Sequence, residues 1–196
     1  VGNGASGSCT NELVTISRVS AAAGFNSLCY TTATRTQLID GNWHHLAVTF
    51  DGSKTRIYID GIERLLTVGA GSDAGAFGGI TTINGASLGS WPVNSSRVYY
   101  LTGSLDEPKI YKSALTASEI LIDMNAGSAA AMGGVLGTQD NEGFGSLSPA
   151  GWWKMDENTG NSTAVDSSGN GKDMTMTSME TTDWTPGKHG SALDFD

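Results

Sequence analysis

The stretch DGNWHHLAVTFDGSKTRIYIDG, residues 40–61, contains two candidate β-strands and the turns that bound them. Alternate positions from His44 to Phe50 fall on one face of an extended chain, and most of them are apolar. Asp51-Gly52 is a strong hairpin turn signal, and Asp60-Gly61 marks the turn after the return strand. The stretch therefore predicts an antiparallel hairpin followed by a second tight turn.

Other runs rich in β-branched and aromatic residues predict strands on both sides of this hairpin. They fall at residues 11–20, 25–39, 64–68, 79–88, 97–101 and 103–111. One helix is predicted near residues 116–124, because Thr116 and Glu119 form a capping box in which each side chain can bond the backbone of the other. Short strands with frequent turns predict an all-β fold, an antiparallel jelly-roll β-sandwich, with one short helix.

The composition narrows the possible partners. Twenty acidic residues against 11 basic ones give a net charge of −9, which disfavours binding to nucleic acid or to an anionic membrane. The sequence has no apolar run of the ~18–20 residues that span a bilayer, so we expect no membrane insertion. Residues 1–9, VGNGASGSC, lack the features of a signal peptide. We expect that a signal was removed or that the sequence is an excerpt.

The composition also changes along the chain. Residues 126–150 are rich in Gly, Ala and Ser and have no hydrophobic period, which is typical of a linker. The predicted organisation is therefore a β-sandwich part at residues 1–125, a linker at 126–150, and further strands at 151–196.

Two motifs of the first part resemble a known family. Residues 40–61 and GSLDEPKIYKSALTASEI, residues 103–120, resemble the second half of a LamG-like domain of the concanavalin A-like lectin/glucanase superfamily. Residues 151–196 resemble the first part of such a domain. There a tryptophan strand and Asp156-Glu157 precede the DSSGNG turn at residues 166–171 and GKHGSALDFD at residues 187–196.

The end of the family pattern thus precedes its beginning, and two explanations compete. The sequence is either an excerpt across the junction of two successive domains, or a circular permutation in which the C-terminal part completes the N-terminal part. The length and composition of the linker favour the excerpt. If the sequence is an excerpt, its halves can still pair between copies, as in domain swapping.

The resemblance also implies a calcium site. LamG-like domains often bind calcium near these elements, and the matching residues here are Asp106, Asp166 and Asn170. Carboxylate, amide and backbone carbonyl oxygens are the ligands that calcium takes. The alternative is turn chemistry, in which Asp and Asn bond their own backbone.

Three aromatic residues are candidates for ligand binding. Trp91, Tyr99 and Tyr100 lie on or near predicted loops, where exposed rings can stack on sugar faces. The alternative is packing in the core or at an edge.

The two cysteines, Cys9 and Cys29, lie 20 positions apart. They fit one disulfide in an oxidising compartment, or two small apolar side chains in a core.

The sequence shows no pair of carboxylates spaced for glycoside hydrolysis, which argues against an enzyme. His44 and His45 are adjacent and point to opposite faces of a strand, so they do not form one metal site. We therefore predict a non-catalytic binding or adhesion module, extracellular or on a bacterial cell surface, that recognises a glycan or a cell-surface protein. The alternative is a structural repeat of an extracellular filament or surface layer, which associates with itself through strand exchange.

Overall fold

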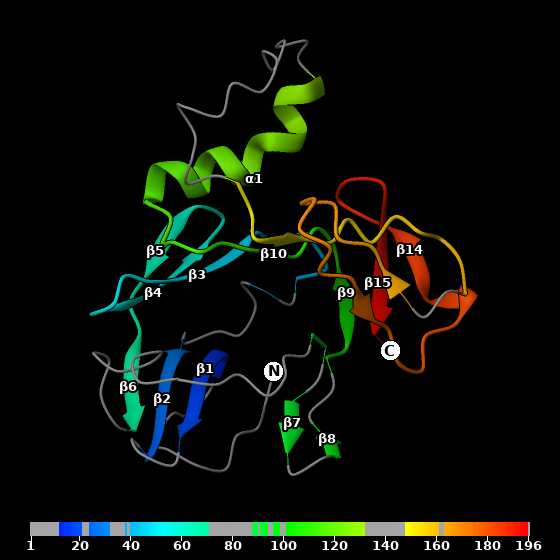
Figure 1. The fold of residues 1–196 in the computed structure, drawn as a ribbon. Helices are drawn as coiled ribbons and strands as arrows, with labels where there is room; N and C mark the ends of the chain where they lie inside the picture. Colours follow the sequence, from blue (N-terminus) through cyan, green and yellow to red (C-terminus); the bar gives the residue numbers. More distant parts are fainter. Residues whose placement is uncertain are drawn as a thin grey trace. The chain divides into compact units, whose positions relative to one another are not determined.

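The computed structural model of the chain describes residues 12–20, 24–31, 38, 40–70, 88–89, 91–93, 96–98, 101–131, 148–160 and 163–195. Strands predominate (Figure 1). The chain divides into two compact units. Unit 1 comprises Val1–Ala86 and Ser113–Met124, and unit 2 comprises Ser87–Lys112 and Asn125–Asp196. Each unit is therefore discontinuous in sequence.

The described strands of unit 1 form two antiparallel sheets. One sheet has the order β1-β2-β6, with β1 (Glu12–Ser20), β2 (Gly24–Thr31) and β6 (Thr67–Ala70). The other has the order β3-β4-β5, with β3 (Leu46–Phe50), β4 (Thr55–Ile59) and β5 (Ile62–Arg64). The predicted hairpin at residues 40–61 is confirmed, because β3 and β4 pair in antiparallel register.

The turn between β4 and β5 consists of Asp60 and Gly61 and fixes the register of the sheet. Both residues have positive φ, 51° and 74°, and the flanking residues Ile59 and Ile62 are direct partners. This is the two-residue hairpin loop that Asp-Gly favours. A Cβ at Gly61 would overlap a Leu121 methyl carbon, so glycine also allows the turn to approach the helix.

The central strand β4 supplies the apolar core of this sheet. Ile57 and Ile59 are 0% and 1% exposed, and Leu38 and Leu66 pack against them. On the opposite face of β4, Tyr58 is also buried. The sheet is therefore covered on both faces at its centre, as expected for a middle strand.

Helix α1 (Ala117–Ala131) begins where the capping box predicts. Glu119 accepts hydrogen bonds from the Thr116 backbone N–H and hydroxyl, at 2.7 and 2.8 Å, and its own N–H donates to the Thr116 hydroxyl. Ile120 is 1% exposed, so this residue anchors the first turn. The helix is longer than predicted and ends at Ala131, because the alanine-rich run after Met124 is favourable in a helix as well as in a linker.

The described strands of unit 2 are short and form four antiparallel groups. They are β7 (Trp91–Val93) with β8 (Ser96–Val98), β10 (Lys109–Ile110) with β11 (Gly151–Trp152), β12 (Thr163–Ala164) with β13 (Met174–Thr175), and the sheet β14-β15-β9, made of β14 (Trp184–Pro186), β15 (Ser191–Phe195) and β9 (Gly103–Leu105). A short 3-10 helix, η3 (Thr181–Asp183), precedes β14. Two pairings, β10 with β11 and β9 with β15, join residues 103–110 to residues 151–195.

The apolar core of unit 2 comes from the C-terminal stretch of the chain. Its buried members are Trp153, Met155, Ala164 and Leu193. Partly buried side chains that pack against them are Met174, Met176, Met179, Trp184 and Phe195. The core of unit 2 therefore comes from residues 153–195, and β9 and β10 pair with the strands β15 and β11 of this stretch.

The structure corrects three details of the sequence interpretation. The strand predicted at 103–111 is broken into β9 and β10, because Glu107 adopts a left-handed φ of 55° and is followed by Pro108, which has no N–H. The strand predicted at 64–68 is divided between β5 and β6, with Leu65 outside both and 87% exposed. Trp91, expected in a loop, lies in the short strand β7.

The all-β class is confirmed, with α1 as the one α-helix of the described residues. Most of the strand predicted at residues 79–88 lies outside the described residues. Within the described ranges, no helix has the length and apolar character needed to span a membrane.

Replacing Ile57 tests the core of unit 1. Ile57→Ala removes a fully buried side chain, and we expect a loss of about 2–5 kcal/mol in the free energy of unfolding. Ile62→Ala is the matched control in the adjacent strand, because Ile62 is 57% exposed, and we expect a change of only about 0.5 kcal/mol. Chemical denaturation of the whole chain measures both, and equal losses would contradict this core.

Candidate functional site

The predicted calcium residues lie in unit 2, and Asp166 is the most buried of them at 8% exposure. Its Oδ1 accepts hydrogen bonds from the backbone N–H groups of Trp152 and Ser168, at 3.0 and 2.9 Å. Its Oδ2 accepts one from the backbone N–H of Lys172 at 2.9 Å. One carboxylate therefore holds strand β11 and both sides of the polar turn at residues 166–173.

These hydrogen bonds stabilise the ionised form of Asp166. A hydrogen bond from the Ser168 side chain, together with N–H bonds from Lys172, Trp152 and Ser168, holds the pKa of Asp166 well below its ordinary value of 3.8, although burial opposes the shift. Asp166 therefore bonds the backbone of its own turn, which is the alternative to calcium binding given in the sequence analysis.

Asn170, the amide of the predicted calcium set, lies at the exposed side of the same turn. Its Nδ2 group donates to the Ser168 hydroxyl at 3.0 Å and to the carbonyl oxygens of Pro149 and Ala150 at 3.3 Å. Asn170 therefore joins the turn to the residues that lead into β11.

Asp106 lies just after β9 and holds a different turn. Its Oδ2 accepts a hydrogen bond from the His189 backbone N–H at 2.8 Å, and a Cβ at Gly187 would approach the same oxygen to 2.7 Å. Its Oδ1 is buried and has no hydrogen-bond partner in the described structure. Burial raises the pKa of Asp106, although the N–H groups of His189 and Lys188 oppose the shift.

Glu107, the neighbour of Asp106, is directed to another partner. It accepts a hydrogen bond from the indole N–H of Trp152, and burial raises its pKa against the effect of that bond. The ammonium groups of Lys109 and Lys154 lie 5.4 and 4.8 Å from the centroid of the Trp152 ring. These are cation–π distances, so Trp152 is held by an anion at its edge and by cations over its ring.

Asp166 and Asn170 both bond Ser168, whereas the hydrogen bond of Asp106 goes to His189, a different part of the described chain. Within the part of the chain that the structure describes, no group of three or more His, Cys, Asp or Glu side chains is placed to hold a metal ion. Asp106, Asp166 and Asn170 therefore stay a prediction as calcium ligands.

The aromatic and cysteine predictions fall mostly outside the described residues. Tyr99, Tyr100 and Cys9 lie outside them. Trp91 and Cys29 lie in β7 and β2, but their side chains are outside the described part. The ligand-binding role of the three aromatic residues and the disulfide therefore stay predictions.

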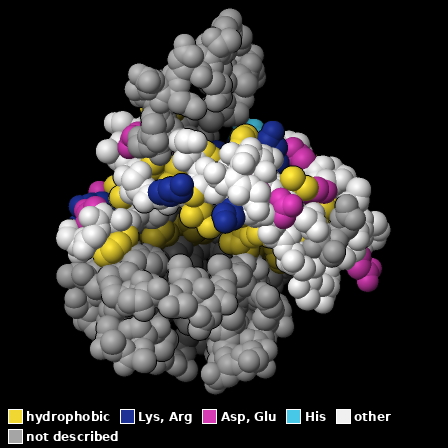
Figure 2. All heavy atoms as spheres, viewed as in Figure 1, with side chains coloured by type: hydrophobic (Ala, Val, Ile, Leu, Met, Phe, Trp, Pro, Cys, Tyr) yellow, Lys and Arg dark blue, Asp and Glu magenta, His cyan; other side chains and the backbone are white. Residues whose placement is uncertain are grey.

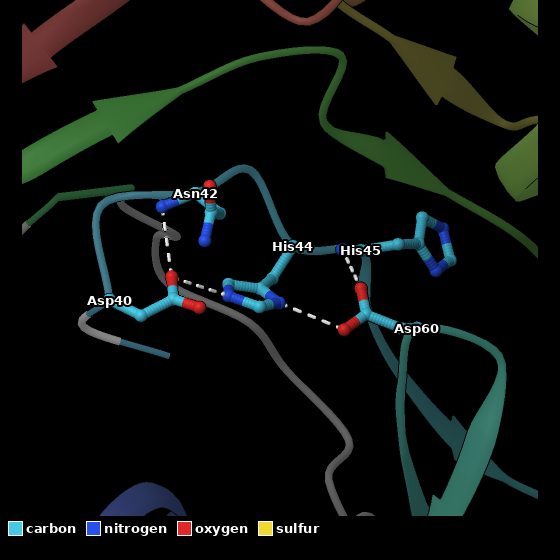
Figure 3. A network of polar contacts seen from close by, with 5 residues as sticks. All are labelled: Asp40, Asn42, His44, His45 and Asp60. Atoms are coloured by element: carbon cyan, nitrogen blue, oxygen red, sulfur yellow. Dashed lines mark hydrogen bonds and ion pairs between the residues drawn. The ribbon is translucent and has the colours of Figure 1, made fainter. Parts of the chain in front are cut away.

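Unit 1 contains a polar cluster that the sequence analysis did not assign (Figure 3). His44 lies between two carboxylates: its Nδ1 is 2.8 Å from Asp60 Oδ2 and its Nε2 is 3.0 Å from Asp40 Oδ1. The second oxygen of Asp60 accepts the His45 backbone N–H at 2.9 Å, and Asp40 Oδ1 also accepts the Asn42 N–H at 2.8 Å. The two histidine rings point apart, as strand alternation predicts.

The carboxylates set the charge of this cluster. Hydrogen bonds to Asp60 and then to Asp40 raise the pKa of His44 above its ordinary 6.5. The hydrogen bonds from Asn42 and His44 lower the pKa of Asp40 to about 2. Burial acts to raise the pKa of Asp60, but bonds from His44 and the His45 N–H lower it overall. Two features of the sequence could have indicated this cluster: the spacing of four positions between Asp40 and His44, and the Asp60-Gly61 turn that places Asp60.

A comparison with protein families identifies one match. The family model described as the concanavalin A-like lectin/glucanases superfamily, of the laminin G type, matches residues 15–121, more than half of the chain. Searches of curated proteins and of solved structures gave no match.

Replacing Asp166 tests the turn that it holds. Asp166→Asn keeps the shape but turns an NH₂ group toward backbone N–H donors, so we expect a lower thermal midpoint at pH 7. Val165→Ala, at the exposed neighbouring residue, is the control and should stay near wild type.

The pH dependence follows from the lowered pKa of Asp166. The stability contributed by the ionised carboxylate is present above its ordinary 3.8 and is lost as pH falls through the lower folded value. The difference between wild type and Asp166→Asn should therefore narrow in strong acid. A constant difference from pH 7 into strong acid would contradict this account.

Proposed function

The chain belongs to the concanavalin A-like lectin/glucanases superfamily, and from this membership we propose that it is a non-catalytic binding module of a secreted or cell-surface protein. The family match is the observation that carries the proposal. It covers the hairpin β3–β4, the strands β9 and β10, and the start of α1. Domains of the laminin G type are generally binding modules and typically extracellular, and they commonly bind glycans or proteins.

The positions of the carboxylates in unit 2 support a non-catalytic role. A retaining glycosidase needs two carboxyl groups about 5–5.5 Å apart that flank the scissile bond. Asp106 and Glu107 are one adjacent acidic pair of unit 2, but Asp106 bonds the His189 backbone and Glu107 bonds the Trp152 indole. Both side chains hold structural partners, which leaves them poorly placed for proton transfer to a sugar.

The surface charge supports a partner other than nucleic acid. On the face in Figure 2, the lysine and arginine side chains of the described residues are scattered, with acidic side chains among them. Nucleic-acid binding needs a basic stripe or patch. Together with the net charge of −9, this pattern favours a glycan or protein partner over nucleic acid.

The proposal includes calcium as an ion that takes part in binding the ligand. Asp106 supports it best, because one buried carboxylate oxygen has no partner in the described structure. Asp166 supports it least, because both of its oxygens already accept backbone N–H groups. A chelator experiment therefore tests the ion separately from the binding activity.

A second candidate function is that of a structural repeat in an extracellular filament or surface layer. The pairing of residues 103–110 with residues 151–195 favours it, because the same strand pairs can form between copies. In that case the protein associates with itself and needs no small ligand.

A glycan array probed with the whole chain, with and without a chelator, tests the first proposal. We expect binding to at least one glycan class, weakened about two- to tenfold by Trp91→Ala, since loss of one aromatic stacking contact is worth about 0.5–1.5 kcal/mol. Trp43→Ala is the matched control, because Trp43 is an exposed tryptophan of unit 1 at 39% exposure. Loss of binding with chelator would support calcium.

Two results would contradict the binding-module proposal in its glycan form. Equal effects of Trp91→Ala and Trp43→Ala would remove the predicted ligand site. No binding to any glycan, together with concentration-dependent assembly in sedimentation, would favour the structural repeat instead.

A further inference from the structure

The cluster around His44 joins two segments that border the sheet β3-β4-β5. Asp40 and His44 belong to the segment that enters β3, and Asp60 is the first residue of the turn between β4 and β5. The backbone already links them, since the Asp60 N–H donates to the His45 carbonyl oxygen at 2.9 Å. Two more hydrogen bonds join the segments, one from the His44 ring and one from the His45 N–H, both to the Asp60 carboxylate. A third, between His44 and Asp40, lies within the first segment.

The positions of the two carboxylates favour a protonated His44 ring. A neutral imidazole has one N–H and one lone pair, whereas the imidazolium has two N–H donors. Here both ring nitrogens lie within 3.0 Å of a carboxylate oxygen, and a carboxylate oxygen can only accept. A neutral His44 would therefore direct a lone pair at an anion at one of its two ends.

We propose that Asp40, His44 and Asp60 form a pH-sensitive clasp that is closed while His44 carries two N–H groups and opens when it loses one. The clasp is independent of the binding function proposed above. Opening leaves the backbone link between Asp60 and His45 in place, so the change is confined to residues 40–44. Trp43 lies in this segment, and its side chain is 39% exposed.

The other charged groups near the clasp fit this assignment. His45 faces Asp123 of α1, with 3.8 Å between Nε2 and Oδ2, and its ring points away from His44. In the described residues, the carboxylates that face His44 are therefore Asp40 and Asp60, one from each segment. Both carry negative charge above their lowered pKa values.

The sign of the pH effect follows from these shifts. The pKa of His44 is raised above 6.5, so its contribution to stability is complete below 6.5 and is lost as pH rises through the higher folded value. The pKa values of Asp40 and Asp60 are lowered, so their contributions are present above 3.8 and are lost as pH falls through the folded values. The clasp is therefore tightest between pH 3.8 and pH 6.5.

Two measurements on the whole chain test the clasp. An NMR titration of the imidazole Cε1–H signals should give His44 a midpoint above 6.5, which moves down in Asp40→Asn because one acceptor anion is lost. Thermal midpoints of wild type should fall from pH 6 to pH 9 relative to those of His44→Gln, which has no group to titrate there. His189→Gln, in unit 2, is the matched control and should keep the wild-type pH profile.

The clasp is overturned if His44 titrates at or below 6.5 in wild type, or if Asp40→Asn leaves its midpoint unchanged. It is also overturned if His44→Gln and wild type show parallel thermal profiles across this range. If His44→Gln does not fold, the NMR titration of wild type and Asp40→Asn decides the question. These outcomes do not depend on whether any glycan binds.

Discussion

The antiparallel pairing of β15 with β9 is the interaction on which most of unit 2 depends. Leu193 pairs with Leu105, and Asp194 pairs with Ser104, so strands about 90 positions apart in the chain share one sheet. The core beside this sheet comes from residues 153–195, and β9 adds an outer strand to it. Without the pairing, β15 would present an unpaired edge and part of that core would be exposed.

The two long-range pairings also place the functional candidates. Asp106 follows β9 directly, so pairing with β15 brings its carboxylate to the turn at Gly187 and His189. The pairing of β10 with β11 brings Lys109 opposite Trp152, and Glu107 then reaches the indole N–H. The side-chain arrangement is thus a consequence of strand register.

The structural details that could be predicted from the sequence depend on residues close together in the chain. The Asp60-Gly61 turn and the Thr116 capping box depend on residues within four positions of each other, and the structure confirms both. Pro108 is a local signal for the break in the strand, but the left-handed backbone of Glu107 could not be predicted from its neighbours. Its left-handed backbone goes with a bond to an indole 45 positions away. The contact of His44 with Asp60 was missed for the same reason, because these residues are 16 positions apart, although Asp40 is only four positions from His44.

Engineered cysteines at Ser104 and Asp194 test most directly whether β9 and β15 pair within one chain. These residues are direct register partners in neighbouring strands, and the Ser104 hydroxyl donates to Asp194 Oδ1 at 3.2 Å, so the two side chains point to the same face. Cys9 and Cys29 are replaced by Ser in all variants. Ser104→Cys with Thr185→Cys is the control, because Thr185 lies in β14 on the other side of β15. The structure predicts that the chain carrying both Ser104→Cys and Asp194→Cys oxidises to a cross-linked monomer, whereas a mixture of the two single variants gives little covalent dimer. Covalent dimer from the mixture, with no cross-linked monomer from the double variant, would contradict it.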